Sequence, residues 1–144
     1  MKIPYMAKLY GNIAFDKSIS RPIANQILKI TTEITFRQIV ILKVIGLLQK
    51  MAPLGDIRRN QASTSVSGLT NVSIASEIYD LYVNSLISSA SVIFGAANIN
   101  PKALRVSGYG ALIYNLMELD AMRIDSQMAQ EIMAFLTGSA SIGQ

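Results

Sequence analysis

The chain has 144 residues, enough for one domain, and 51% of them are hydrophobic while only 15% are charged. Soluble domains average about 25% charged residues, so this chain has few charges with which to cover a surface. Histidine, cysteine and tryptophan are absent. Their absence excludes histidine-based triads, thiol nucleophiles, thiolate or imidazole zinc sites and disulfides. We therefore expect a protein that is not an enzyme and takes no cofactor.

The net charge of +4 conceals an asymmetry along the chain. Residues 1–59 contain ten Lys and Arg against three carboxylates, and residues 60–144 contain three against six. The two segments therefore carry +7 and −3. A basic segment of this kind can face nucleic acid or anionic lipid. It can equally pack against the acidic half of the chain or against an acidic partner protein.

The sequence contains no candidate membrane span. Its most apolar run, residues 39–48, includes Lys43 and is far shorter than the roughly 20 residues that a bilayer requires. The N-terminal residues have neither the apolar core nor the small-residue cleavage site of a signal peptide. We expect a cytoplasmic protein.

Residues 1–34 predict a helical extension at the N-terminus. Four apolar residues at the spacing i, i+3, i+4, i+7 predict a helix over 3–15 with one buried face. These residues are Met6, Leu9, Tyr10 and Ile13. Ser20, followed by Pro22, predicts the start of a second helix.

Residues 36–50 predict the central helix of the core. Thr35 and Gln38 have the spacing of a capping box, and apolar residues cover about half of the helix circumference. The opposite face is predicted to be polar and to point away from the core. It contains Gln38, Lys43, Gly46, Gln49 and Lys50.

Residues 53–72 are rich in Ser, Thr, Asn and Gly, which predicts a long polar loop. Loops of this length are usually functional or disordered, and the sequence leaves both open. Ser73 then predicts the cap of a helix over 74–88.

The remaining residues predict a hairpin and two further helices. Short strands over 91–94 and 102–106 flank a turn, and Ser107 predicts the cap of a helix over 108–119. A last helix over 126–137, within the C-terminal segment 125–137, begins after Asp125 or Ser126 and ends at Gly138. The expected fold is a single domain over 1–144, mainly α, with five to six helices and one small antiparallel hairpin.

The order helix, helix, hairpin, helix over residues 36–119 resembles a winged-helix domain, with a core over 35–119. The segment from Ala75 to Ile87 ends in a Leu-Ile step, similar to the entry into the wing in bacterial winged-helix regulators. The segment LRVSGYG, from Leu104 to Gly110, is similar to their returning strand, in which Leu-x-x-Ser/Thr-x-x-Gly leads into the next helix. The resemblance implies a winged-helix-like fold that can bind DNA or protein.

One feature of this segment argues against DNA binding. The second helix of a helix-turn-helix enters the major groove, where its side chains meet bases and phosphates. The helix at that position here contains Glu77 and Asp80 and no Lys or Arg. We therefore expect a protein–protein interaction or oligomerisation domain, whose partner is another protein or a second copy. Such a domain can be one piece of a larger bacterial or phage protein.

The alternative is a winged-helix regulator that binds nucleic acid through its basic N-terminal half and its wing. Its phosphate contacts are predicted at five residues. They are Lys50, Arg58, Arg59, Lys102 and Arg105. The same residues can instead belong to a solvated surface that only keeps the protein soluble.

Two further patterns have ordinary structural explanations. Glu118, Asp120 and Asp125 could hold a hard cation, but they straddle a helix end and a helix start, where Asp is expected as a cap. We expect no metal site. Gly108 and Gly110 match the beginning of a dinucleotide-binding fingerprint, but the third glycine is missing and no βαβ unit surrounds them.

Overall fold

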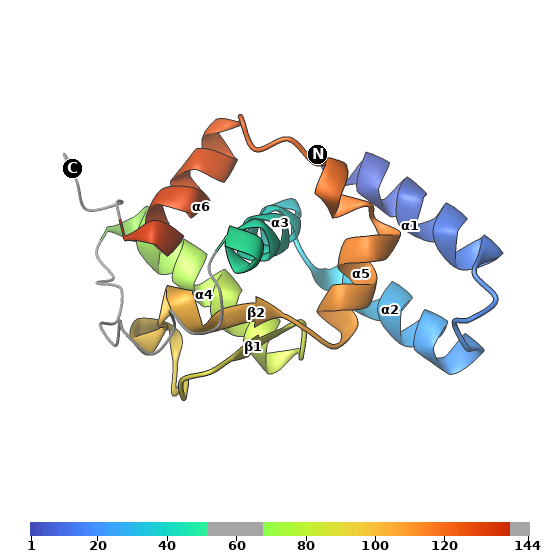
Figure 1. Ribbon diagram of the computed structural model, residues 1–144, viewed down its shortest axis with the longest axis horizontal. Helices are drawn as coiled ribbons and strands as arrows, with labels where there is room; N and C mark the ends of the chain where they lie inside the picture. The colour runs from blue at the N-terminus through green and yellow to red at the C-terminus, as the bar shows by residue number, and fades with distance from the viewer. Residues whose placement is uncertain (52–67, 139–144) are drawn as a thin grey trace.

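In the computed structural model, residues 1–51 and 68–138 are described, and within them the chain forms six α-helices and one two-stranded sheet (Figure 1). The prediction of a mainly α fold with one small antiparallel hairpin is confirmed. The helices are α1 (Ile3–Phe15), α2 (Arg21–Glu33), α3 (Phe36–Met51), α4 (Leu69–Val83), α5 (Tyr109–Leu116) and α6 (Gln127–Thr137). The strands are β1 (Ile87–Ser89) and β2 (Leu104–Val106), and short 3-10 turns are formed by Ala96–Asn98, Pro101–Ala103 and Leu119–Ala121.

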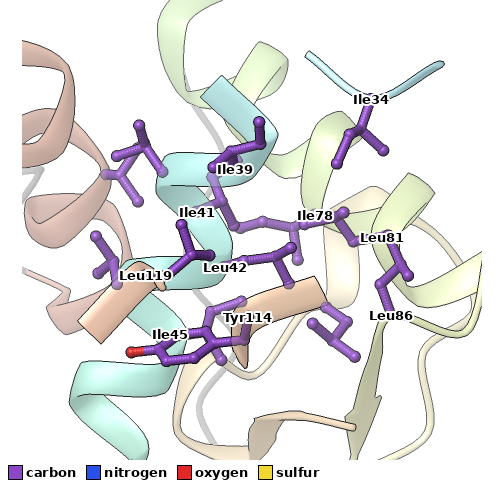
Figure 2. Packing of buried hydrophobic residues seen from close by; sticks show 14 of the residues in the cluster. Ile34, Ile39, Ile41, Leu42, Ile45, Ile78, Leu81, Leu86, Tyr114 and Leu119 are labelled. Atoms are coloured by element: carbon purple, nitrogen blue, oxygen red, sulfur yellow. The ribbon is translucent and has the colours of Figure 1, made fainter. Parts of the chain in front are cut away.

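Helix α3 lies at the centre of the molecule, in contact with α4, α5, α6 and β2 (Figure 1). Residues 38–46 are buried without a break. Figure 2 shows Leu119 on one side of α3 and Ile78 on the other, so apolar side chains pack against the helix from several directions. The prediction of a central core helix is confirmed.

The predicted polar face of α3 is wrong for Gln38, Lys43 and Gly46, which are all buried. Neighbouring elements surround the helix, and each polar group finds a backbone partner there. Gln38 Nε2 donates to the carbonyl of Glu77 at 3.2 Å, and Lys43 Nζ donates to the carbonyl of Asp120 at 3.2 Å. Buried polar groups are stable only when paired in this way.

The capping box at the start of α3 is present as predicted. The backbone N–H of Gln38 donates to Thr35 Oγ1 at 3.0 Å, and the backbone N–H of Thr35 donates to Gln38 Oε1 at 2.9 Å. These two bonds satisfy two N–H groups that have no partner within the helix.

Helix α4 begins and ends five residues earlier than the predicted 74–88 helix. Residues 69–72 of the predicted loop are helical, and the rest of that loop up to 67 lies outside the described residues. The helix ends in a Schellman motif: Ser85 N–H donates to Tyr82 O at 3.1 Å, and Leu86 N–H donates to Leu81 O at 2.9 Å. Ser85, at φ 65°, takes the left-handed position usually given to glycine, so the sequence carries no clear stop signal.

The early end of α4 also moves the first strand. Leu86 and Ile87 are buried and lead directly into β1, which pairs with β2 in the register Ile87 to Val106. The predicted strand over 91–94 is wrong, because these residues belong to the loop that joins β1 to β2.

The two glycines of the SGYG segment allow close packing of α5 on the end of α4. A Cβ at Gly110 would overlap the backbone of Leu86, and a Cβ at Gly108, which has φ 54°, would lie 2.9 Å from the carbonyl oxygen of Ser85. The predicted helix over 108–119 is shorter, since α5 ends at Leu116 and Glu118 takes a left-handed conformation at φ 56°.

Helix α6 follows the prediction at both ends. Ser126 Oγ accepts from the backbone N–H of Ala129 at 3.2 Å, and Gly138 closes the helix at φ 79°. Its buried residues include Ile132 and Phe135, and the helix packs on α3.

Helices α1 and α2 lie at one end of the long axis and both pack on α5 (Figure 1). Asn12 Nδ2 donates to the carbonyl of Leu116 at 2.7 Å. Lys2 Nζ donates to the carbonyl of Ile34 at 2.6 Å, at the C-terminal end of α2, where a cation is favoured. The predicted buried face of α1 is wrong at Tyr10, which is half exposed, because the helix is rotated so that Tyr5 packs inward instead.

The arrangement of α3, α4, the hairpin and α5 is compatible with a winged-helix layout. Among the described residues, no helix combines the length and the apolar character needed to cross a bilayer.

Candidate functional site

Three of the five residues predicted to contact phosphates lie near one end of α3. Lys102 and Arg105 line a pocket of about 420 Å³, and Lys50 lines a second pocket of about 190 Å³. Gln49 lines both pockets, so the two pockets lie next to each other. Arg58 and Arg59 lie outside the described residues.

The larger pocket has a mostly apolar lining, in which two cations stand beside aliphatic side chains. Its volume is within the usual range for sites that bind small molecules. Its lining consists of Ile45, Leu48, Gln49, Met51, Pro101, Lys102, Leu104, Arg105, Leu136 and Thr137.

Two of the three cations already have partners within the chain. Lys50 Nζ lies 2.5 Å from Asp120 Oδ1. The guanidinium group of Arg105 donates to the carbonyls of Lys102 at 3.0 Å and Leu104 at 2.7 Å, and burial lowers its pKa. Phosphate binding at this site would therefore compete with existing hydrogen bonds.

Asp120 is the centre of a polar cluster beside the smaller pocket. Its Oδ1 atom accepts from Lys50 Nζ and from the Tyr114 hydroxyl at 3.1 Å. The bonds from Lys50 and Tyr114 lower the pKa of Asp120. Burial, together with the bond to Asp120, raises the pKa of Tyr114 to about 12. The cluster links α3 to the segment that follows α5, and it contains no activated nucleophile.

Glu77 of α4 is half-buried and binds the start of α3. Its carboxylate accepts from Arg37 Nε and, at 2.6 Å, from Thr35 Oγ1. Arg37 also donates to Ser73 Oγ. The carboxylate is therefore neutralised by Arg37, and the repulsion of phosphates expected from Glu77 is reduced.

The exposed face of α4 contains no cation. Five residues that recur at spacings of three and four are exposed along it. They are Leu69, Val72, Ser76, Asp80 and Val83. In the loop between the strands, Val92 and Phe94 are also exposed, and residues 81–101 include no charged side chain. These are the surfaces that would face nucleic acid in a DNA-binding winged helix.

Helix α1 has an exposed face without charge, which we call the outer face. It consists of Ile3, Pro4, Ala7, Tyr10, Gly11, Ala14 and Phe15, all of them exposed. Ile3 is 75% exposed and Phe15 is 88% exposed. Lys8 stands at its edge, with Nζ 5.7 Å from the centre of the Tyr5 ring. Leu9 is the one residue of α1 that is fully buried.

The three carboxylates considered as cation ligands have separate partners. Glu118 accepts from Asn12, Asp120 accepts from Lys50, and Asp125 pairs with Arg123 at 3.0 Å. Within residues 1–51 and 68–138, no three metal-ligating side chains come together.

Comparisons of the chain with protein-family models, with curated proteins and with solved structures give no match. The sequence analysis did not identify the outer face of α1, although the low charge of this helix indicates it. The helix contains a single charged residue among thirteen, whereas a half-exposed helix normally has a polar face.

Proposed function

We propose that this protein is a non-enzymatic protein–protein interaction module that binds a partner through the outer face of α1. The observation that carries the proposal is that one side of this helix is exposed and uncharged. Its exposed side contains seven uncharged residues, including the large side chains of Ile3, Tyr10 and Phe15. Contiguous apolar surface of this kind on a folded protein marks a site of interaction.

A second observation supports binding to protein rather than to nucleic acid. We propose that α4 and the hairpin form the second helix and the wing of a winged-helix-like core. In that arrangement the helix exposes Leu69 and Val72, and the wing exposes Phe94. Helix α4 contains no Lys or Arg, and the two cations of the wing, Lys102 and Arg105, lie at and just before its second strand, β2. Apolar side chains here are suited to a protein partner, because phosphate contacts need Lys or Arg.

Site-specific photo-cross-linking in cells that naturally produce the protein tests the proposal. A benzophenone amino acid in place of Phe15 is expected to form adducts with a protein, identified by mass spectrometry. The same amino acid in place of Glu131, an exposed residue on α6, provides the matched control. Absence of any protein adduct from position 15, or equal labelling from both positions, would contradict the proposal.

The alternative is binding of nucleic acid at the basic end of α3. It is supported by the presence of Lys50, Lys102 and Arg105 in the linings of two pockets that share Gln49. Fluorescence anisotropy with a labelled random duplex at 50 and 200 mM salt tests it. A micromolar signal that falls steeply with salt, and that weakens in Lys102→Gln, would favour this alternative. No binding at 50 mM salt would exclude it.

A further inference from the structure

We infer that the larger pocket near the end of α3 binds a small amphipathic anion, a fatty carboxylate with a single alkyl chain. This site is separate from the outer face of α1, on which the proposed function depends. The pocket has a volume of about 420 Å³, which is sufficient to enclose most of one small ligand. Its walls come from α3, the turn Pro101–Ala103, β2 and the end of α6.

The lining of this pocket extends from the core to the surface. Ile45, Leu104 and Leu136 are buried and line it from three different elements. Met51 and Lys102, which also line it, are exposed. An alkyl chain that lies on aliphatic side chains gains about fourfold in affinity for each methylene that it buries. The apolar part of the ligand is therefore expected on the buried residues, and its polar end near the exposed ones.

The charge of the pocket favours an anion. Its lining contains Lys102 and Arg105 and, among the described residues, no Asp or Glu. Lys102 is exposed and forms no ion pair within residues 1–51 and 68–138. Arg105 is held in place, because its Nη1 atom donates to the carbonyls of Lys102 and Leu104. Lys102 can therefore donate to a carboxylate, while Arg105 supplies a fixed positive charge.

Gln49 adds a hydrogen-bond donor of known identity. Its Oε1 atom accepts from the backbone N–H of Val106 at 2.9 Å, so the other polar atom of the amide, Nε2, is a donor. Within the described part of the chain, Nε2 makes no hydrogen bond. The half-buried Gln49 thus presents an amide N–H group in the lining that also contains Lys102. These two donors match the two oxygens of a carboxylate.

The size and composition of the pocket argue against larger anions. A volume of about 420 Å³ is in the lower part of the range for small-molecule sites. The described lining contains no aromatic ring on which a nucleic-acid base could stack. A single alkyl chain that ends in one carboxylate fits both the volume and the aliphatic lining.

Methyl NMR of the full chain, titrated with octanoate, tests the location of the site. With ¹³C-labelled Ile and Leu methyl groups, the largest shift changes are expected at Ile45, Leu104 and Leu136. Leu9 and Ile27, buried on α1 and α2, are the internal controls and are expected to stay unchanged. No change up to about 5 mM octanoate would overturn the inference. Changes confined to the outer face of α1 would also overturn it.

Three probes with the same alkyl chain test the preference for an anion: octanoate, 1-octanol and octylammonium. The same titration gives a Kd for each probe. Octanoate is expected to bind about tenfold more tightly than 1-octanol, because its carboxylate accepts charge-assisted hydrogen bonds. Octylammonium is expected to bind more weakly than either, since it meets two cations. Equal affinities for the three probes would overturn the assignment of an anion.

A charge-removing variant assigns the preference to one residue. Lys102→Gln is expected to weaken the binding of octanoate about tenfold and to leave that of 1-octanol unchanged. Lys29→Gln is the matched control, because Lys29 is exposed on α2, at the end of the long axis away from α6 (Figure 1). Equal weakening in both variants would show that only net charge matters and would overturn the role of Lys102.

A series of hexanoate, octanoate and decanoate tests whether the alkyl chain enters the pocket. Each step adds two methylenes, so the affinity is expected to rise about tenfold per step until the pocket is filled. Similar affinities across the series would show that the chain stays outside, and would overturn the inference even if the carboxylate binds near Lys102.

Discussion

Helices α1 and α3 are both poor in charge, but the chain covers them to very different extents. α3 has three charged residues among sixteen and is buried over residues 38–46. α1 has one among thirteen, yet only Leu9 is fully buried. A helix that is apolar on all sides is normally surrounded by its own protein. The less charged helix lies at the periphery, and one of its sides is exposed.

The two helices also differ in how their polar groups are used. In α3, Gln38 and Lys43 are buried and donate to backbone carbonyls of neighbouring segments. In α1, Asn12 points inward and holds the helix to the end of α5, while the outer face makes no polar contact that would fix a position. The inner side of α1 therefore determines where the helix sits, and the outer face is exposed.

The largest expected effect is the difference between truncating a core residue and truncating a residue of the outer face. Ile41→Ala in α3 is expected to lower the free energy of unfolding by about 2–5 kcal/mol, because it leaves a cavity among fully buried neighbours. Phe15→Ala is expected to change it by no more than about 0.5 kcal/mol. Urea denaturation of dilute, monomeric protein measures both. A comparable loss in Phe15→Ala would mean that the outer face is covered within the monomer.

A Gly→Ala substitution in each helix is expected to change the stability of the protein in opposite directions, by smaller amounts. At Gly46 of α3, an added Cβ would overlap the ring of Tyr114, and overpacking of this kind costs about 1–3 kcal/mol. At Gly11 of α1 the space is open, so Gly11→Ala should stabilise the monomer by about 0.5–1 kcal/mol through helix propensity. Thermal unfolding measures both variants. Stabilisation in Gly46→Ala would show that Tyr114 moves aside freely.

Local signals in the sequence predicted much of this fold. The capping box of Thr35 and Gln38, the cap at Ser126 and the stop at Gly138 each depend on residues a few positions apart. The pattern of apolar residues from Phe36 onward was sufficient to identify the central helix. These features could be predicted because their physical cause is contained in a short segment.

Features that depend on distant residues could not be predicted in the same way. The end of α4 uses Ser85 in a left-handed conformation, stabilised by the packing of Leu86 in the core. The burial of Lys43 depends on a carbonyl at Asp120, far along the chain. Of the predicted phosphate-binding residues, Lys50, Lys102 and Arg105 line two pockets that share Gln49. Their sequence positions did not show that Lys50 pairs with Asp120.

An effect that depends on pH concerns Tyr114, whose ring lies against α3 and whose hydroxyl donates to Asp120. Its pKa is raised to about 12 in the folded protein, against an ordinary value of 10. The folded state therefore favours the neutral phenol. This contribution to stability is fully present below pH 10 and is lost as the pH rises through about 12.

An absorbance titration of phenolate formation tests this assignment, because the chain has six tyrosines and each adds to the signal. The step near pH 12 is expected to disappear in Tyr114→Phe. It should remain in Tyr10→Phe, which removes a tyrosine from the outer face of α1 and keeps the contact between Tyr114 and Asp120. Tyr114→Phe should also raise the pKa of Asp120 toward its ordinary value, since one of its two donors is lost. If the late step survives in Tyr114→Phe, the contact between α3 and the segment after α5 is looser than the buried ring implies. The difference in burial between α3 and α1 would then be smaller.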